Sequence, residues 1–566
     1  MDYDAVVQHL GEFGLYQRRL VIMLSLITIP AGLHTGAMTF IAAIPEHHCR
    51  VPQMTSAGFN MTRPEALNLS IPLEVVDGMR GFSRCKRYDV ADQFGWLNRS
   101  TSTCEVDGWE YDQSQYHSSI VTQYDLVCDR AWLREMAQSI FMAGVGMGGI
   151  IFGLMSDRVG RHVTLMTCLL LQLTFGVAAA FSPNLGTFAA LRFMVGAVSN
   201  GAFYSGFVLG IESLGPSKRT TFGMAMCLLP AVGYLILGLM AYYIRDWWLL
   251  QLALSLPTLP LLMFRWFISE SPRWLLVAKK SDKARKAIER IANVNGVDFS
   301  PETFEKLNGC TKVRNDDGET PPSDRSRKYS IVDLVRTSQM RKITLAMNVA
   351  WLISVCVYYS LILGTSQLVG DHYVNFVLGA CVEIVAIFVA WVVMTKWGRK
   401  RPFIAFMFVA GVSCLAAASV PRDLGVLATT LAMGGRFGIS IGFCTLTVYA
   451  AEVFPTVIRN IGVGQASMVS RIGGVVSPFI GLLSTVWRPL PLLVYGVLCC
   501  VAGMAVTVLP ETHGMSLPNT PEDMERIARN LSTPSPPKCP DETEHVVPIS
   551  KSRSAATTIY EMVSSV

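Results

Sequence analysis

The sequence predicts an all-α membrane protein with twelve transmembrane helices arranged as two six-helix halves. Its composition supports this fold class, because 51% of the 566 residues are hydrophobic and only 16% are charged, which is too apolar for a soluble protein of this size. Twelve apolar runs have a length of about 20 residues, which is enough to cross a hydrocarbon core. Charged residues and glycines also recur at an interval of about 240 positions, which indicates an internal duplication.

The duplicated positions lie at the ends of the predicted helices. Each repeated glutamate precedes its arginine by the same number of residues, and parallel repeats of this kind are typical of membrane transporters. The repeated pairs are Gly160 and Gly398, Arg161 and Arg399, Glu212 and Glu452, and Arg219 and Arg459.

The apolar runs set the domain organisation. The predicted spans are 20–44, 136–155, 163–182, 185–213, 221–243, 247–268, 343–364, 374–395, 402–420, 425–450, 461–484 and 491–509. We expect a cytoplasmic N-terminus (1–19), a first transmembrane helix (20–44), a large extracellular glycosylated loop (45–135), helices two to six (136–268), a cytoplasmic linker with short helices (269–342), a C-terminal six-helix half (343–510) and a disordered cytoplasmic tail (511–566).

The long loop after the first span has the features of an oxidising, glycosylating compartment. Its four cysteines allow three disulfide pairings, and the sequence does not choose among them. An even number of spans then puts both termini on the cytoplasmic side, and basic residues on the predicted inner loops agree with this orientation. The loop cysteines are Cys49, Cys85, Cys104 and Cys128, and the sequons begin at Asn60, Asn68 and Asn98.

Several stretches resemble known transporter families. The hairpin 153–161, Gly-Leu-Met-Ser-Asp-Arg-Val-Gly-Arg, resembles the loop motif of the major facilitator superfamily. Further stretches, together with the large glycosylated loop, resemble the organic ion transporters of solute carrier family 22. They are 11–14 (Gly-Glu-Phe-Gly), 45–49 (Pro-Glu-His-His-Cys), 107–110 (Asp-Gly-Trp-Glu), 125–128 (Asp-Leu-Val-Cys), 244–247 (Ile-Arg-Asp-Trp), 270–275 (Glu-Ser-Pro-Arg-Trp-Leu) and 452–456 (Glu-Val-Phe-Pro-Thr). The resemblance implies polyspecific transport of small organic ions by alternating access, through a central site between the halves.

Two ionisable residues, Glu383 and Arg471, lie well inside predicted spans. A charge at bilayer depth is costly, so each is expected to face a cavity or a partner. One interpretation is a salt bridge between the two with no ligand role. The other is a zwitterion site: the resemblance matches Glu383 to a glutamate of cation-transporting members and Arg471 to an arginine of anion- and carnitine-type members. Aromatic rings that bind ammonium groups are expected to complete it, and the candidates are Phe203, Phe207, Tyr358, Tyr359 and Phe443.

The charged residues at the helix ends are candidates for gating. We expect the hairpin charges to pair with helix ends and linker charges in one access state and to release them in the other, and we expect Glu212 to pair with Arg219 and Glu452 with Arg459. The alternative is that these charges only set topology and solvate loops. The hairpin charges are Asp157, Arg158 and Arg161.

Motifs for enzymatic activity, metal binding and ATP hydrolysis are absent from the sequence, and no cofactor or nucleic-acid partner is expected. Three functions remain: a plasma-membrane carrier of organic cations and zwitterions such as carnitine and quaternary amines, an organic anion exchanger that depends on Arg471, and a non-transporting receptor or scaffold. A coupling ion, sodium or a proton, is left open. The last residues, Ser564, Ser565 and Val566, resemble a ligand for a PDZ domain.

Overall fold

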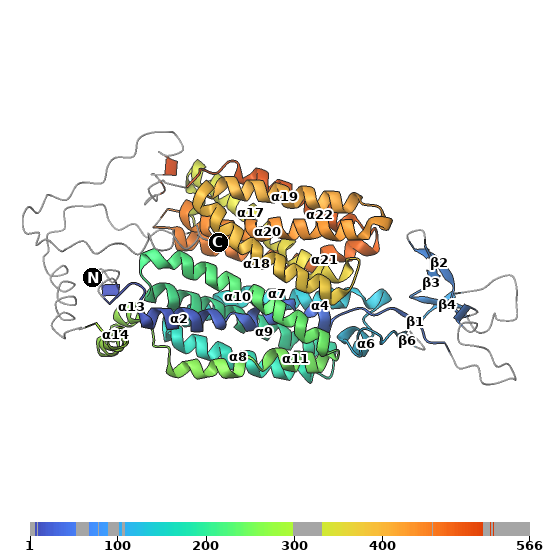
Figure 1. Cartoon of the computed structure of the whole chain (residues 1–566), viewed down its shortest axis with the longest axis horizontal. Helices are drawn as coiled ribbons and strands as arrows, with labels where there is room; N and C mark the ends of the chain where they lie inside the picture. Colours follow the sequence, from blue (N-terminus) through green and yellow to red (C-terminus); the bar gives the residue numbers. More distant parts are fainter. Residues whose placement is uncertain are drawn as a thin grey trace, which may run out of the picture.

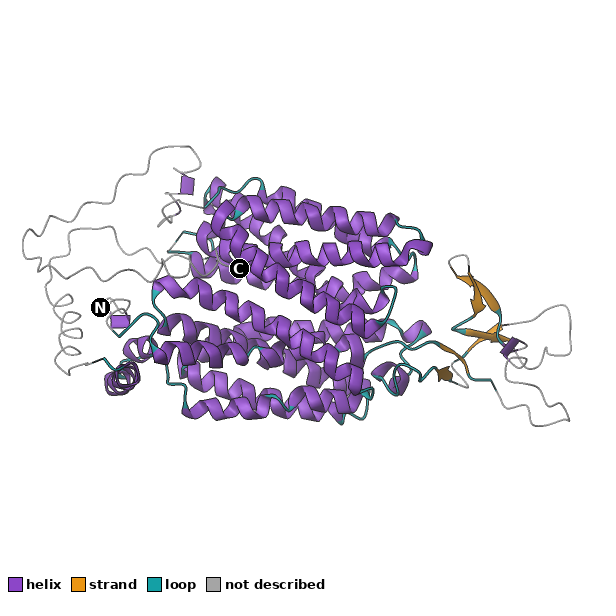
Figure 2. Cartoon of the chain, in the orientation of Figure 1, coloured by secondary structure: helices purple, strands orange, loops and turns teal. Residues whose placement is uncertain are grey.

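The computed structural model describes residues 6–7, 10–51, 67–68, 70–76, 79–88, 101–104, 108–297, 331–455, 457–512, 521 and 524–525. Within these residues the chain forms an elongated bundle of helices, with short strands beyond one end and short helices beyond the other (Figures 1 and 2). We call the end near the strands the disulfide end, because both disulfides lie there, and the opposite end the linker end.

Eleven helices in the described part of the chain are long and apolar enough to cross a membrane. The N-terminal half holds α2 (Leu15–Leu26), α3 (Ile29–Gly36), α4 (Met38–Ile41), α7 (Trp132–Val159), α8 (Arg161–Ala180), α9 (Leu185–Ser213), α10 (Arg219–Tyr243), α11 (Trp247–Ser255), α12 (Thr258–Leu261) and the 3-10 helix η4 (Leu262–Trp266). The C-terminal half holds α17 (Ser338–Leu363), α18 (His372–Trp397), α19 (Lys400–Ser419), α20 (Gly425–Val453), α21 (Arg459–Leu482) and α22 (Leu490–Val506).

The twelve predicted spans correspond to these helices, with differences at the ends. The predicted span 491–509 is α22, an apolar helix of 17 residues that is shorter than the others. The predicted span 20–44 is a continuous apolar run, but in the structure it is divided among α2, α3 and α4. A proline accounts for one break, because Pro30 has no N–H to donate and stands at the start of α3.

Short elements lie at the linker end. Helix α14 (Ser281–Asn295) covers the stretch in which apolar residues recur at helical spacing, and its buried face contains Ala284, Ile288 and Ile291. Its last residue ties it to the bundle, since the Asn295 amide nitrogen donates to the Leu10 carbonyl at 2.8 Å and its amide oxygen accepts from the Tyr16 N–H at 2.9 Å. The other short elements in the described residues lie at both ends of the bundle. They are α6 (Ile120–Tyr124), α13 (Pro272–Val277), α16 (Asp333–Arg336), η2 (Cys128–Arg130), η3 (Pro216–Lys218), η5 (Gly364–Gln367), η6 (Arg422–Leu424) and η7 (Leu483–Thr485).

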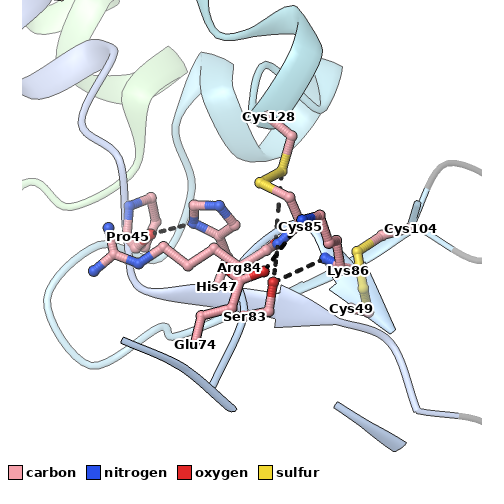
Figure 3. Close-up of a disulfide and its surroundings, with 10 residues drawn as sticks. All are labelled: Pro45, His47, Cys49, Glu74, Ser83, Arg84, Cys85, Lys86, Cys104 and Cys128. Atoms are coloured by element: carbon pink, nitrogen blue, oxygen red, sulfur yellow. Dashed lines mark hydrogen bonds and ion pairs between the residues drawn. A yellow bond between two sulfur atoms is a disulfide. The ribbon is translucent and has the colours of Figure 1, made fainter. Parts of the chain in front are cut away.

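The disulfide end has three antiparallel strand pairs. They are β1 (His47–Cys49) with β6 (Trp109–Tyr111), β2 (Leu73–Val76) with β3 (Met79–Phe82), and β4 (Lys86–Tyr88) with β5 (Thr101–Thr103). The disulfides join Cys49 to Cys104 and Cys85 to Cys128, so the structure selects one of the three pairings (Figure 3). Asn68, one of the three predicted glycosylation sites, is exposed, whereas Asn60 and Asn98 lie outside the described residues.

The two halves meet along α10 with α18 and along α7 with α21. At the disulfide end, the segment 112–119 also joins them. A hydrogen bond of 3.2 Å links the Tyr116 hydroxyl to the His372 ring, and the Tyr373 hydroxyl donates to the Gln115 carbonyl at 3.1 Å. Burial raises the pKa of Tyr116 above its ordinary value, so its hydroxyl stays protonated. On the other side of the segment, Ser118 donates to Asp246, before α11, at 2.9 Å.

Candidate functional site

Glu383 is buried near the middle of α18, where its charge has a partner. One carboxylate oxygen accepts from Arg436 of α20 at 3.0 Å, and the other accepts from the Tyr358 hydroxyl of α17. The glutamate side chain is 5% exposed and the arginine side chain 2%. Burying two charges is costly unless they pair and form hydrogen bonds, and this pair meets both conditions. The carboxylate is therefore neutralised inside the C-terminal half.

The close fit of Arg436 depends on a glycine of α18. A Cβ atom on Gly379 would lie 2.1 Å from Nη1 of Arg436, a distance that no pair of non-bonded atoms tolerates. Glycine leaves space for the guanidinium at this position, and a larger residue would displace it. Helix packing thus brings Arg436 to Glu383.

Arg471 lies on α21 at the boundary between the halves. Its Nη2 donates to the Tyr204 hydroxyl of α9 at 3.1 Å, and the same hydroxyl is 3.0 Å from the Ser467 hydroxyl. Its Cβ lies against α7, because a Cβ atom on Gly146 would be 3.3 Å from it. Among the described residues no carboxylate lies within ion-pair distance of Arg471. Arg471 therefore lacks the neutralising partner that Glu383 has.

Our interpretation of Glu383 and Arg471 as a pair that neutralise each other is thus wrong, since the ion-pair partner of Glu383 is Arg436. Arg436 was not among the predicted site residues, although it lies in the predicted span 425–450. Arg192, which is fully buried in α9, was not predicted either. In both spans an arginine followed by phenylalanine interrupts an apolar run, and this signal could have identified them.

Arg192 has a different environment from Arg436. Its Nη2 donates to the His34 carbonyl at 3.1 Å, and its guanidinium lies 4.2 Å from the centre of the Phe141 ring. Both partners belong to the N-terminal half, so we assign Arg192 to the packing of that half rather than to the site between the halves.

The predicted aromatic residues form two groups, and all five are partly buried. In the N-terminal half, Phe203 and Phe207 stack with ring centres 6.3 Å apart. In the C-terminal half, Tyr358 stacks on Phe443 at 5.2 Å and contacts Tyr359 at 5.3 Å. The structure thus brings Tyr358 into contact with Glu383 and stacks Phe443 on Tyr358. It also brings Phe203 next to Tyr204, the hydrogen-bond partner of Arg471.

The hairpin at the linker end forms a compact ionic network. Nε of Arg161 lies 3.3 Å from the Glu212 carboxylate, and Nη2 lies 2.9 Å from Asp157. Glu270 accepts from the first two amides of α8, those of Arg161 at 2.9 Å and of His162 at 3.1 Å. A carboxylate at this position also interacts favourably with the helix dipole. Arg158 is exposed.

The second half repeats the network. Arg399 pairs with Glu452 at 2.9 Å, and Glu511 accepts from the Arg399 amide at 2.9 Å. Sequence spacing led us to expect Arg219 and Arg459 as partners of Glu212 and Glu452. The structure adds partners that the spacing did not predict, because Glu212 and Glu452 form ion pairs with the hairpin arginines Arg161 and Arg399. Glu452 also interacts electrostatically with Arg459. The tertiary structure explains these pairs, because the start of α8 lies beside the end of α9, and the start of α19 lies beside the end of α20.

In the part of the chain that the structure describes, no three His, Cys, Asp or Glu side chains are grouped closely enough to hold a metal ion. The chemistry available at the centre is that of fixed charges, hydroxyl groups and ring faces. Such groups can bind an organic ion.

Comparisons with known proteins agree with this architecture. Residues 85–524 match the family described as "Sugar (and other) transporter". The chain is 37% identical to "Organic cation transporter protein" of Drosophila melanogaster, covering 96% of this chain and 97% of that protein, and 35% identical to "Organic cation/carnitine transporter 2" of Homo sapiens, covering 94% and 96%. It is also 35% identical to "Solute carrier family 22 member 21" of Mus musculus, covering 94% of each.

Among solved structures, the inward-open xylose transporter XylE from E. coli matches the fold with a TM-score of 0.58 at 15% identity, covering 90% of this chain and 99% of that one. The fold, the duplicated hairpin networks and the full-length similarity all agree. The chain belongs to solute carrier family 22 of the major facilitator superfamily, and its relatives are membrane transporters rather than enzymes.

Proposed function

We propose that the protein carries small organic zwitterions and cations, such as carnitine-like molecules and quaternary amines, across the plasma membrane by alternating access. The observation that carries this proposal is the environment of Arg471. It is a guanidinium between the two halves that contacts a tyrosine hydroxyl and has no carboxylate partner among the described residues. A substrate carboxylate supplies the missing negative charge, and guanidinium binds carboxylate with well-defined geometry.

The cationic end of the substrate binds the aromatic groups in this proposal. Tyr358, whose hydroxyl contacts Glu383, stacks on Phe443. Ring faces attract quaternary ammonium ions by about 0.5–2 kcal/mol each. Glu383 adds less than an isolated carboxylate would, because Arg436 already offsets its charge. The names of the relatives, which include organic cation and carnitine transporters, support the same substrate class.

A second candidate is an organic anion exchanger. The specific observation in its favour is that the Glu383–Arg436 pair is neutral, so Arg471 is left as the uncompensated charge of the described central residues. A net positive site favours a substrate whose carboxylate is not accompanied by an ammonium group. The two candidates make different predictions for Glu383.

Uptake of labelled carnitine, tetraethylammonium and para-aminohippurate in expressing cells tests the proposal. We expect carnitine uptake to be lost in Arg471→Ala and weakened in Glu383→Gln, with tetraethylammonium uptake sensitive to Glu383→Gln alone. Arg130→Ala, which removes an exposed arginine near the disulfide end, is the control. Uptake of para-aminohippurate alone, lost in Arg471→Ala and unchanged in Glu383→Gln, would replace the proposal with the anion exchanger. No uptake of any of the three, with the protein at the cell surface, would favour a receptor or scaffold.

The remaining parts of the proposal concern gating, orientation and coupling. The hairpin networks hold the linker end in one access state, with both termini cytoplasmic and the disulfides outside. A neutral zwitterion gains no energy from membrane voltage, so its accumulation requires a co-transported sodium ion or proton. Uptake after sodium replacement, and then after depolarisation, distinguishes these cases.

The proposed contact with a PDZ protein involves Ser564, Ser565 and Val566, which lie outside the described residues. A terminal valine would fill the apolar pocket of such a domain while the last residues pair with a sheet edge. Recovery of PDZ proteins with the intact chain but not with a chain that lacks Val566 tests this contact.

A further inference from the structure

A cavity of about 300 Å³ lies at the disulfide end of the C-terminal half. Its walls come from α17, α19, α20, α21 and α22, and α4 and α7 of the N-terminal half close one side. Arg471, Tyr204, Phe443 and Tyr358 are not among its lining residues. The cavity is therefore separate from the central site, and the two share only the Arg436 side of the Glu383–Arg436 pair.

The charged residues of the cavity are mostly positive. Three arginines line it, with one carboxylate, Glu135. That carboxylate is already paired with Arg134 at 2.6 Å. Arg488 is exposed near the end of the bundle, whereas Arg436 is 1% exposed in the interior. Arg134 and Arg436 are each paired with a carboxylate, so among the described lining residues the positive charge left for a ligand is that of Arg488.

Two buried lining residues have polar atoms without a partner. Nε and Nη1 of Arg436 lack a hydrogen-bond acceptor in the described residues, and only its Nη2 reaches Glu383. The side-chain amide of Gln138, a residue that is 2% exposed, has neither a donor nor an acceptor partner in the part of the chain that the structure describes. Leaving such buried groups unpaired costs about 1–3 kcal/mol each, so an oxygen-bearing ligand at this place is favoured.

We propose that this cavity is a second binding site, for a small organic anion that has a carboxylate on an apolar body. The carboxylate binds the guanidinium of Arg436 and the amide of Gln138. The apolar body contacts the rest of the lining, which includes Leu361, Met433 and Leu492. The volume is at the lower end of the range of about 300–1,000 Å³ for small-molecule pockets, so the occupant is small.

The shared arginine couples this site to the central one, a consequence that rests on the proposed function. A ligand carboxylate at Nε or Nη1 of Arg436 competes with Glu383 for the charge of the guanidinium, which leaves the Glu383 carboxylate more available to the ammonium group of a substrate. Binding in the cavity then raises the apparent affinity for a cation, by about fivefold or more if the coupling is typical of allosteric proteins.

Thermal unfolding of the purified full-length protein tests the site without relying on transport. We expect 2-naphthoate in chloride-free gluconate buffer to raise the melting temperature of the wild type. Ala428→Phe places a ring at the cavity wall and should abolish the shift, whereas Leu427→Phe makes the same change at a neighbouring position that does not line the cavity and should retain it. Arg488→Gln, at an exposed position, should reduce the shift without disturbing the core.

The controls separate this site from the central one. Arg471→Ala should keep the naphthoate shift even if it abolishes transport, so loss of the shift in that variant would place the ligand centrally and overturn the proposal. An equal shift in Ala428→Phe and Leu427→Phe, or an unaltered shift in Arg488→Gln, would also overturn it. A rise in the melting temperature that chloride produces and 2-naphthoate does not would refute the proposal that the ligand is an organic anion.

Discussion

The Glu383–Arg436 pair allows a direct test of whether Glu383 is a structural partner or a substrate ligand. The two side chains are 5% and 2% exposed, and they meet at 3.0 Å in the middle of the C-terminal half. Removing one member of such a pair leaves an uncompensated buried charge and costs about 3–5 kcal/mol, whereas replacing both by apolar groups of similar volume is close to neutral. We therefore expect Glu383→Met and Arg436→Met each to lower the unfolding free energy by about 3–5 kcal/mol. The double variant should regain most of this loss.

The measurement is unfolding by sodium dodecyl sulfate in mixed micelles, followed by circular dichroism, on all four members of the double-mutant cycle. The matched control is the exposed pair Arg285–Glu289 in α14, at 2.7 Å, with side chains 48% and 38% exposed. Its cycle should give only about 0.3–0.5 kcal/mol. A double variant in which the losses of the two single variants add would refute the ion-pair interpretation. A stable Glu383→Met protein that fails to transport cations would instead make Glu383 a ligand.

Three further predictions concern the linker end and the disulfides. Glu212→Gln should lower turnover more than Asp157→Asn at equal surface expression, because the Glu212 side chain is 14% exposed and the Asp157 side chain is 71% exposed. The reverse order in an uptake assay would contradict the role of the hairpin network in transport. Gly160→Ala should reduce turnover and the yield of folded protein, because Gly160 has a φ of 125° and a Cβ there would lie 2.3 Å from a Glu270 oxygen; unchanged uptake kinetics and yield would show that the strain is relieved. Cys85→Ala and Cys128→Ala should each lower the unfolding free energy by about 2–5 kcal/mol, and the double variant should lose no more than either single variant. Thiol labelling of each single variant should find one new free cysteine.

The local features of the sequence predicted much of the fold. Apolar runs of the right length gave the membrane-spanning helices, and the repeated hairpin predicted two related halves, which α7–α8 and α18–α19 confirm with matching networks. The breaks within the first span were not predicted, because only one of them coincides with a proline at a helix start. Hydropathy averages over such interruptions.

Local sequence features predicted the candidate site only in part. Glu383 and Arg471 stood out because a charge in an apolar run is unusual, and both lie inside helices of the bundle. The partner of Glu383 could not be identified in the same way, since Arg436 is 53 positions away on another helix. Which faces of α18 and α20 meet depends on packing, and the glycine that permits the contact leaves no charge signal of its own.

By itself, the sequence of this protein determined the number of apolar helices, the duplication and the position of the cysteine-rich loop, because length, hydropathy and spacing are properties of the chain. Tertiary structure decided which cysteines pair, which glutamate each hairpin arginine binds, and that Arg436 rather than Arg471 neutralises Glu383. The physical reason is that a buried charge takes whichever partner the packed helices place within a few ångströms, and distance along the chain does not specify that partner.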